Sequence, residues 1–162
     1  MKTITLDTGV LVLLVVGATK PNLIHSHKTT RLYPSDSYTW LCEILAGYDE
    51  HIITLGILQE ASEILSANGR FAYHTLQALD QIVDEDNVLS LTRFFEGRIG
   101  IDQVAREGCS LQVDVVDASA LLLVSSGIPI ITCNTRLYLE ASRRCNGCID
   151  FSKHVLDIAL AG

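Results

Sequence analysis

The sequence is poor in aromatic residues and in positive charge. Aromatic residues make up 6% of its 162 positions, with one tryptophan, one methionine and three prolines. Hydrophobic residues still reach 48%, so an ordinary core can form, mainly from the Leu, Ile, Val and Ala that buried strands and helices share. Twelve Lys and Arg against 19 Asp and Glu give a net charge of -7, which excludes a protein that coats nucleic acid through excess basic charge. A nucleic-acid partner would need local basic contacts or a bridging metal ion.

The sequence also lacks a long hydrophobic run. Val10 to Val16 is too short to span a bilayer, and Asp7 stands where a signal peptide would carry basic residues, so we expect neither a membrane span nor secretion. Five cysteines, an odd number, do not suit a disulfide framework and predict reduced thiols in the cytoplasm. Cys145 and Cys148 have the spacing of half a zinc site, but the five histidines form no H-x3-H pair, so we expect both thiols to be metal-free.

Strand and helix patterns alternate along the whole chain. The first strand should end near Asp7 and lead into a helix, followed by a long loop with a small basic cluster over 17–34. Further strands are expected at 51–54, 87–92, 130–134 and 149–151, and further helices at 35–47, 58–66, 71–83, 99–106, 115–126, 137–144 and the C-terminus. This alternation predicts one α/β domain over residues 1–162, a three-layer sandwich with a central parallel sheet.

Acidic residues follow the first two predicted strands. Ligands of open parallel sheets bind outside the carboxyl ends of the strands, and Asp7 lies where the first strand meets its helix. Glu60 and Glu63 lie one turn apart in the helix that follows the second strand. Each residue also has a structural interpretation, because Asp7 can cap the next helix and the two glutamates can be solvated surface residues.

Two more polar pairs lie farther along the chain. Asp114 and Asp117 stand three apart in an apolar helix start, where Asp114 is the better candidate for an N-cap. Neighbouring carboxylates raise each other's pKa unless a cation neutralises them, and magnesium or manganese is the simple counter-ion. Thr132 and Asn134 end a predicted strand, where Asn134 can form a turn or bind a metal ion or water through its amide oxygen.

Four short motifs follow one another along the chain: Leu6-Asp7-Thr8-Gly9-Val10-Leu11, Gln59-Glu60-Ala61-Ser62, Asp117-Ala118-Ser119 and Thr132-Cys133-Asn134-Thr135-Arg136-Leu137. In this order and at these strand and helix positions, they resemble the PIN domain family over nearly the whole chain. PIN domains are α/β folds with a central parallel sheet, and many are ribonucleases that use Mg2+ or Mn2+ held by three or four acidic side chains. The resemblance is to the bacterial and archaeal branch that includes the VapC-like toxins, although this chain has a longer insertion after its first helix.

The resemblance implies a hydrolase, an endoribonuclease that cleaves single-stranded RNA. By position, Asp7, Glu60 and Asp117 would bind Mg2+ or Mn2+, and Thr132 and Asn134 match the closing T-x-D motif. Asn134 replaces the usual fourth aspartate, and the interval from Asp117 to Thr132 is about one residue short, so Asp114 can share or take over the role of Asp117. All six are therefore candidate catalytic residues. A cognate antitoxin and a homodimer are partners that the family allows.

Two other functions fit the same residues. A non-catalytic PIN-like module could bind RNA or a protein, with Asn134 marking a degenerate acidic site. A phosphatase-like enzyme would need a carboxylate two residues after Asp7, where Gly9 stands instead. Candidate bases for RNA, which can equally be a scattered surface set, are Lys28, Arg31, Arg70, Arg93 and Arg136.

Overall fold

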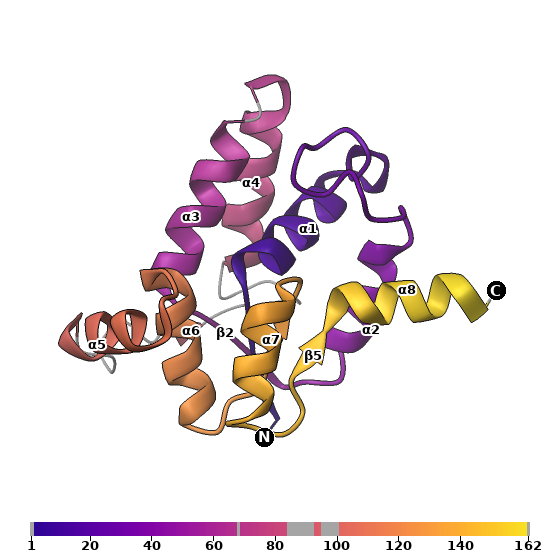
Figure 1. The fold of residues 1–162 in the computed structure, drawn as a ribbon. Coiled ribbons are helices and arrows are strands. Elements are labelled where there is room, and N and C mark those ends of the chain that lie inside the picture. Colours follow the sequence, from indigo (N-terminus) through magenta and orange to yellow (C-terminus); the bar gives the residue numbers. More distant parts are fainter. Residues whose placement is uncertain (1, 68, 84–92, 95–100, 162) are drawn as a thin grey trace.

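The fold is built on five parallel strands in the order β3-β2-β1-β4-β5 (Figure 1). The computed structural model describes residues 2–67, 69–83, 93–94 and 101–161. The strands are β1 (Thr3–Leu6), β2 (Glu50–Ile53), β3 (Arg93–Phe94), β4 (Ile130–Thr132) and β5 (Ile149–Asp150). The prediction of an α/β fold with a central parallel sheet is therefore confirmed. The strand expected at 87–92 lies outside the described residues.

Helices cover both faces of this sheet, which gives three layers. On one face α1 (Thr8–Thr19) packs with α2 (Ser37–Leu45), α3 (Leu55–Ser66) and α4 (Ala72–Val83). On the other face α6 (Val115–Ser125) packs with α5 (Ile101–Leu111) and α7 (Thr135–Ser142), while α8 (Phe151–Ala161) follows β5. Two short 3-10 helices, η1 (Pro21–Leu23) and η2 (Gly69–Phe71), lie beside the ends of α1 and α4.

The helix α1 forms the centre of the core. All residues from Val10 to Gly17 are buried, so the helix is surrounded by protein on every side. This explains why its sequence is a continuous apolar run without a polar face. Within the described ranges no single helix is long and apolar enough to cross a membrane, and only the bent pair of α5 and α6 meets that test together.

Two helix starts differ from the sequence expectation. The helix α3 begins at Leu55, three residues earlier than expected, because the hydroxyl of Thr54 caps it by accepting a hydrogen bond from the N–H of Ile57 at 3.3 Å. The helix α2 begins at Ser37, two residues later than the expected start at 35, and its N-cap residue Asp36 makes no side-chain cap bond. The hydroxyl of Ser35 instead makes a hydrogen bond with His25 at 2.9 Å.

Gly17 lies at a close contact between α1 and Tyr38 of α2. A Cβ atom added there would lie 2.3, 2.5 and 2.6 Å from Cδ2, Cγ and Cβ of Tyr38. Because Cβ of Tyr38 is fixed to the backbone, a rotation of that side chain cannot relieve the overlap. A larger residue would therefore force the two helices apart.

We predict that Gly17→Ala lowers the free energy of unfolding by about 1–3 kcal/mol, because overpacking outweighs the better helix propensity of alanine. Gly56→Ala in α3 is the matched control, since its added Cβ would lie 3.5 Å from the nearest atom, in Val116. Stability of the control should be unchanged or slightly higher. Urea unfolding of both variants measures the difference, and equal stabilities would contradict the packing role of Gly17.

Candidate functional site

A cavity of about 260 Å³ opens at the carboxyl edge of β1 and β4. Its lining residues are Asp7, Thr8, Gly9, Glu60, Asp114, Asp117, Cys133 and Asn134. They come from the β1–α1 junction, from α3, from the start of α6 and from the β4–α7 junction. The structure thus brings together five of the six candidate residues, and the sixth, Thr132, is buried at the end of β4.

The Asp7 carboxylate is buried and hydrogen-bonded through both oxygens. Its Oδ1 accepts from the N–H of Val10 at 2.7 Å, which caps α1. Its Oδ2 accepts from the N–H of Cys133 at 2.9 Å and from the hydroxyl of Thr132. Burial raises the pKa of Asp7 above its ordinary value, although these hydrogen bonds oppose the shift. The capping interpretation therefore holds, and the same carboxylate also joins β1 to β4.

Glu60 reaches the cavity from the second turn of α3. The hydroxyl of Thr8 donates a hydrogen bond to Oε2 of Glu60 at 2.5 Å, so the start of α1 holds this side chain. The hydroxyls of Thr54 and Ser119 lie 3.0 Å apart and join the start of α3 to α6. Glu63, one turn later, is exposed and does not line the cavity. The surface interpretation therefore applies to Glu63 and not to Glu60.

Asp114 and Asp117 have different roles at the start of α6. Asp114 is the N-cap, as expected, and its Oδ1 accepts from the N–H of Asp117 at 2.7 Å. Asp117 is partly buried, and its pKa is raised to about 6 by burial and then by the charges of Asp114, Asp7 and Glu60. Both aspartates line the cavity, but Asp117 is the one whose charged form the surrounding carboxylates disfavour.

Asn134 uses its amide oxygen to cap α7. Oδ1 accepts from the N–H groups of Arg136 at 3.0 Å and Leu137 at 3.2 Å. Its Nδ2 donates to Oδ2 of Asp117 at 3.4 Å, and its N–H donates to the Thr132 hydroxyl at 2.8 Å. The oxygen that was a candidate metal ligand is therefore engaged in capping, and Asn134 presents a donor to the acidic cluster. Thr132 lies behind Asp7 and orients it.

Three helices begin at this cavity, with Asp7, Asp114 and Asn134 as their N-caps. The N-terminus of a helix carries a partial positive charge from its aligned peptide dipoles and free N–H groups. The starts of α1, α6 and α7 therefore offset part of the repulsion among the carboxylates. This explains how four acidic side chains can share one cavity in a folded chain.

Arg136, a candidate base for RNA, is exposed, but its guanidinium is hydrogen-bonded to the backbone of its own chain. Its guanidinium donates to the carbonyl oxygens of Leu111 at 2.9 Å and Gln112 at 3.3 Å. Gln112 has a φ of 54°, a strained conformation for a residue other than glycine. Arg136 thus stabilises the turn between α5 and α6, and its charge lowers the pKa of Asp117. The side chain of Arg93, another candidate base, lies outside the described part of the chain.

Sequence reasoning did not assign roles to Thr8 or Cys133. Thr8 follows Asp7 directly, and a hydroxyl beside a candidate ligand was a signal that could have been used. Cys133 has no such signal; burial raises the pKa of its thiol, as does the charge of Asp7. All five cysteines are free, and the thiols of Cys145 and Cys148 donate to the backbone carbonyls of Asn146 and Cys145.

The donor set suits a hard divalent cation, because Mg2+ and Mn2+ prefer carboxylate oxygens. As the side chains stand, no three Asp, Glu, His or Cys residues among those described are arranged to hold a metal ion. The reason lies in their hydrogen bonds, since Asp7 is turned toward Thr132 and Glu60 toward Thr8. Metal binding would require bridging waters or a local rotation, above all of Glu60, which is only partly buried.

We predict that metal-free protein loses stability as pH rises from about 4 to about 6, because the raised pKa of Asp117 means that the folded state binds this proton more tightly than the unfolded state does. Asp117→Asn should flatten part of this fall and, above about pH 7, raise the free energy of unfolding by roughly 1 kcal/mol, allowing for partial exposure. Urea unfolding in EDTA across this pH range measures the effect. Identical pH profiles for the two proteins would contradict it.

A scan against protein-family models found no matching family. A search of curated proteins found no match, and a search of solved structures found none either. The functional interpretation therefore depends on the chemistry of this cavity and on the motifs that line it.

Proposed function

We propose that the chain is a PIN-like endoribonuclease that cleaves single-stranded RNA with Mg2+ or Mn2+. The observation that carries the proposal is that Asp7, Glu60 and Asp117, which lie far apart in the sequence, line one cavity at the carboxyl edge of a parallel sheet. These are the residues to which the motif resemblance gives a metal-binding role. Asp114 adds a fourth carboxylate to the same cavity.

Each of these residues would have a distinct part in the reaction. Asp7, Glu60 and Asp117 would hold the divalent ion, which when bound would activate a water and offset negative charge at the scissile phosphate. Thr132 and the N–H of Cys133 keep Asp7 in one orientation. Asn134 donates to Asp117, and thereby orients it beside the other carboxylates. The fixed part of the site is Asp7, and the adjustable part is Glu60.

The second candidate function is a non-catalytic module that binds RNA or a protein. Two observations favour it: Asn134 supplies no carboxylate and uses its oxygen as a helix cap, and the described side chains are not pre-arranged around a metal position. Metal binding and RNA cleavage separate the two functions directly.

We predict that the protein cleaves single-stranded RNA with Mn2+ or Mg2+, and that EDTA abolishes cleavage. Glu60→Gln should lower the cleavage rate roughly 10–100-fold or more. A loss of roughly 10–100-fold is typical of residues that only support a metal ligand, and Glu60 is proposed to be a ligand itself. The fold should survive, because the amide oxygen of glutamine can still accept from Thr8. Glu63→Gln, the same change one turn later and outside the cavity, is the matched control and should keep full activity.

Glu60→Gln is a sharper test than Asp7→Asn. An asparagine at position 7 would turn an NH2 group toward the N–H of Val10 or Cys133, with a loss of about 1–3 kcal/mol of stability. Reduced activity could then reflect unfolding. Cleavage that persists in EDTA or in Glu60→Gln would indicate another mechanism or a contaminating nuclease. A folded protein that binds no Mn2+ by calorimetry would favour the non-catalytic module.

We predict that Asn134→Asp tightens Mn2+ binding, because aspartate caps α7 as well as asparagine does and adds a carboxylate to the cavity. Without metal, the same variant should be less stable by about 1 kcal/mol, since it replaces a donor to Asp117 with a like charge. Calorimetric titration with Mn2+ and urea unfolding in EDTA measure the two effects. Unchanged Mn2+ affinity would argue against a live metal site.

A further inference from the structure

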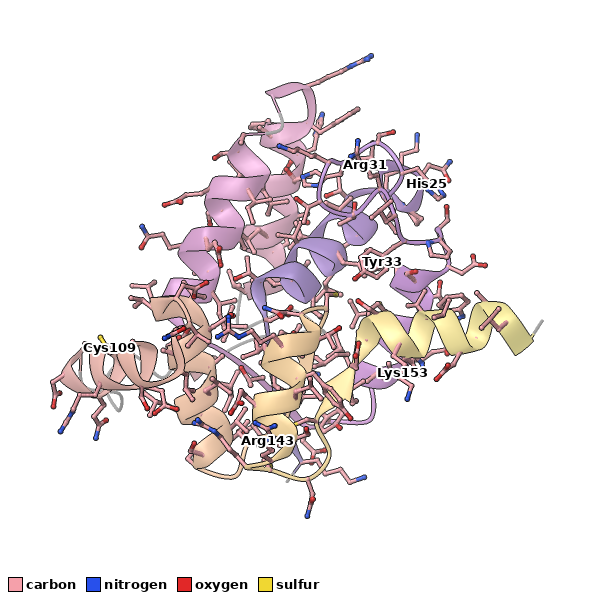
Figure 2. The ribbon with its side chains drawn as sticks, viewed as in Figure 1. His25, Arg31, Tyr33, Cys109, Arg143 and Lys153 are labelled. Atoms are coloured by element: carbon pink, nitrogen blue, oxygen red, sulfur yellow. The ribbon has the colours of Figure 1, made fainter. Side chains whose placement is uncertain are left out.

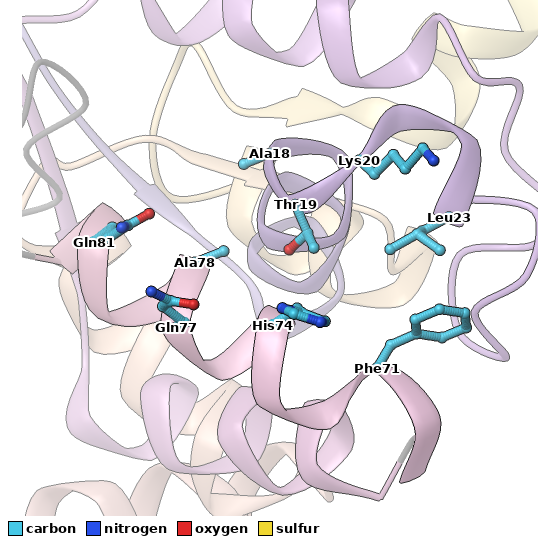
Figure 3. Close-up of a pocket in the computed structure, with 9 residues that line it drawn as sticks. All are labelled: Ala18, Thr19, Lys20, Leu23, Phe71, His74, Gln77, Ala78 and Gln81. Carbon is cyan, nitrogen blue, oxygen red and sulfur yellow. The ribbon is translucent and has the colours of Figure 1, made fainter.

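A second and larger hollow lies at the opposite end of α1. We call it the α1–α4 groove; its volume is about 430 Å³, and its lining residues are Ala18, Thr19, Lys20, Leu23, Phe71, His74, Gln77, Ala78 and Gln81. Figure 3 shows Lys20 and Leu23 on one wall, with Phe71, His74, Gln77 and Gln81 following each other along the other. The groove is thus formed by two segments about 50 residues apart in the sequence.

Acidic residues are sparse in the two segments that form the groove, where Asp80, next to Gln81 in α4, is the one carboxylate. Residues 8–35 and 64–79 are free of Asp and Glu in a chain that has 19 of them, and these stretches carry Lys20, Lys28, Arg31 and Arg70. Lys20 is labelled in Figure 3 and Arg31 in Figure 2. Lys20 is exposed, and within the described residues its side chain makes no hydrogen bond or ion pair. The exposed ammonium of Lys20 therefore gives the groove a local positive charge on a protein whose net charge is -7.

The acidic cavity does not cancel this charge. Asp7 and Lys20 flank opposite ends of α1, whose 12 residues correspond to a length of about 18 Å. The Debye length at physiological ionic strength is only about 8 Å, so charges separated by this distance are largely screened from each other. Because α1 is buried along its length, the groove and the acidic cavity keep a fixed separation.

The lining of the groove combines an aromatic ring, amides, a lysine and a histidine. An aromatic ring such as that of Phe71 can stack on a flat base. The guanidinium of Arg70 lies 5.8 Å from the ring centroid and adds a cation beside this ring. Gln77 carries an amide, whose donor and acceptor groups suit the edge of a base. Lys20 and His74 also line the groove and suit a phosphate. The volume falls within the range of about 300–1,000 Å³ typical of small-molecule sites.

We propose that the α1–α4 groove binds a nucleoside monophosphate unit, with the base against Phe71 and the phosphate at Lys20. This inference rests on the proposed function: the unit belongs to a single-stranded RNA, of which one nucleotide is held in the α1–α4 groove while another part of the strand occupies the acidic cavity. A free nucleoside monophosphate would offer the same chemistry, and the experiment below distinguishes the two sources.

The test is binding of a fluorescein-labelled oligoribonucleotide in EDTA, where the proposed cleavage cannot occur. Phe71→Leu should weaken binding about tenfold through loss of stacking. Lys20→Gln should weaken it several-fold and reduce the slope of log affinity against log salt by about 0.7, the value for one phosphate contact on a single strand. Lys153→Gln, the same charge change on α8, is the matched control and should leave affinity and slope unchanged (Figure 2).

Competition with adenosine monophosphate and with inorganic phosphate identifies the ligand. Tighter binding of the oligomer than of the mononucleotide, with both sensitive to Phe71→Leu, supports RNA. Equal affinities of the oligomer and the mononucleotide, both weakened by Phe71→Leu, support a binding site in the groove but make a free nucleotide its ligand. Equal effects of Lys20→Gln and Lys153→Gln, or binding insensitive to Phe71→Leu in a variant that melts like wild type, overturn the proposal. Because this assay contains no metal, its failure is distinct from failure of the cleavage test on Glu60→Gln.

Discussion

The burial of α1 is the constraint on which the rest of the fold depends. A helix surrounded by protein cannot leave its first N–H groups to water, so a side chain must accept from them. Asp7 does this with one oxygen, and its other oxygen binds the end of β4, which joins the helix to two neighbouring strands. The helices α2, α3 and α4 then pack against α1, as closely as Gly17 allows. A carboxylate at the sheet edge is thus a structural requirement before it is a functional one.

The same principle recurs around the acidic cavity. Asp114 and Asn134 cap α6 and α7, so three side chains of the candidate site also complete a helix. The starts of α1 and α7 converge because β1 and β4 end at one edge of the sheet and each is followed by a helix, and the turn after α5 brings the start of α6 to the same edge. The positive ends of these helices make a dense acidic cluster tolerable. Structural and functional interpretations of such residues are therefore not alternatives, and a variant of Asp7 changes both.

The sequence was sufficient for the architecture and for the acidic residues of the cavity. Alternating strand and helix signals predict the parallel sheet, and the motif resemblance, together with the place of Asp7 at a strand end, predicts that Asp7 meets Glu60 and Asp117. Hydrogen-bond partners were not predictable in this way. The bond from Thr8 to Glu60 joins residues 52 positions apart, and Arg136 binds carbonyl groups that any residue possesses. The α1–α4 groove depends likewise on how two distant helix ends pack, which no local period encodes.

The cap at position 134 has an evolutionary consequence. Asn and Asp are nearly equivalent N-caps, so exchange between them is almost silent for the folding of α7. The exchange nevertheless changes the formal charge of the cavity by one unit. The cap therefore does not decide which of the two residues stands here, and the cost of an aspartate is the repulsion that its charge adds when no cation is bound. A single base change can therefore add or remove one negative charge in the cavity, while the architecture that positions the other carboxylates persists.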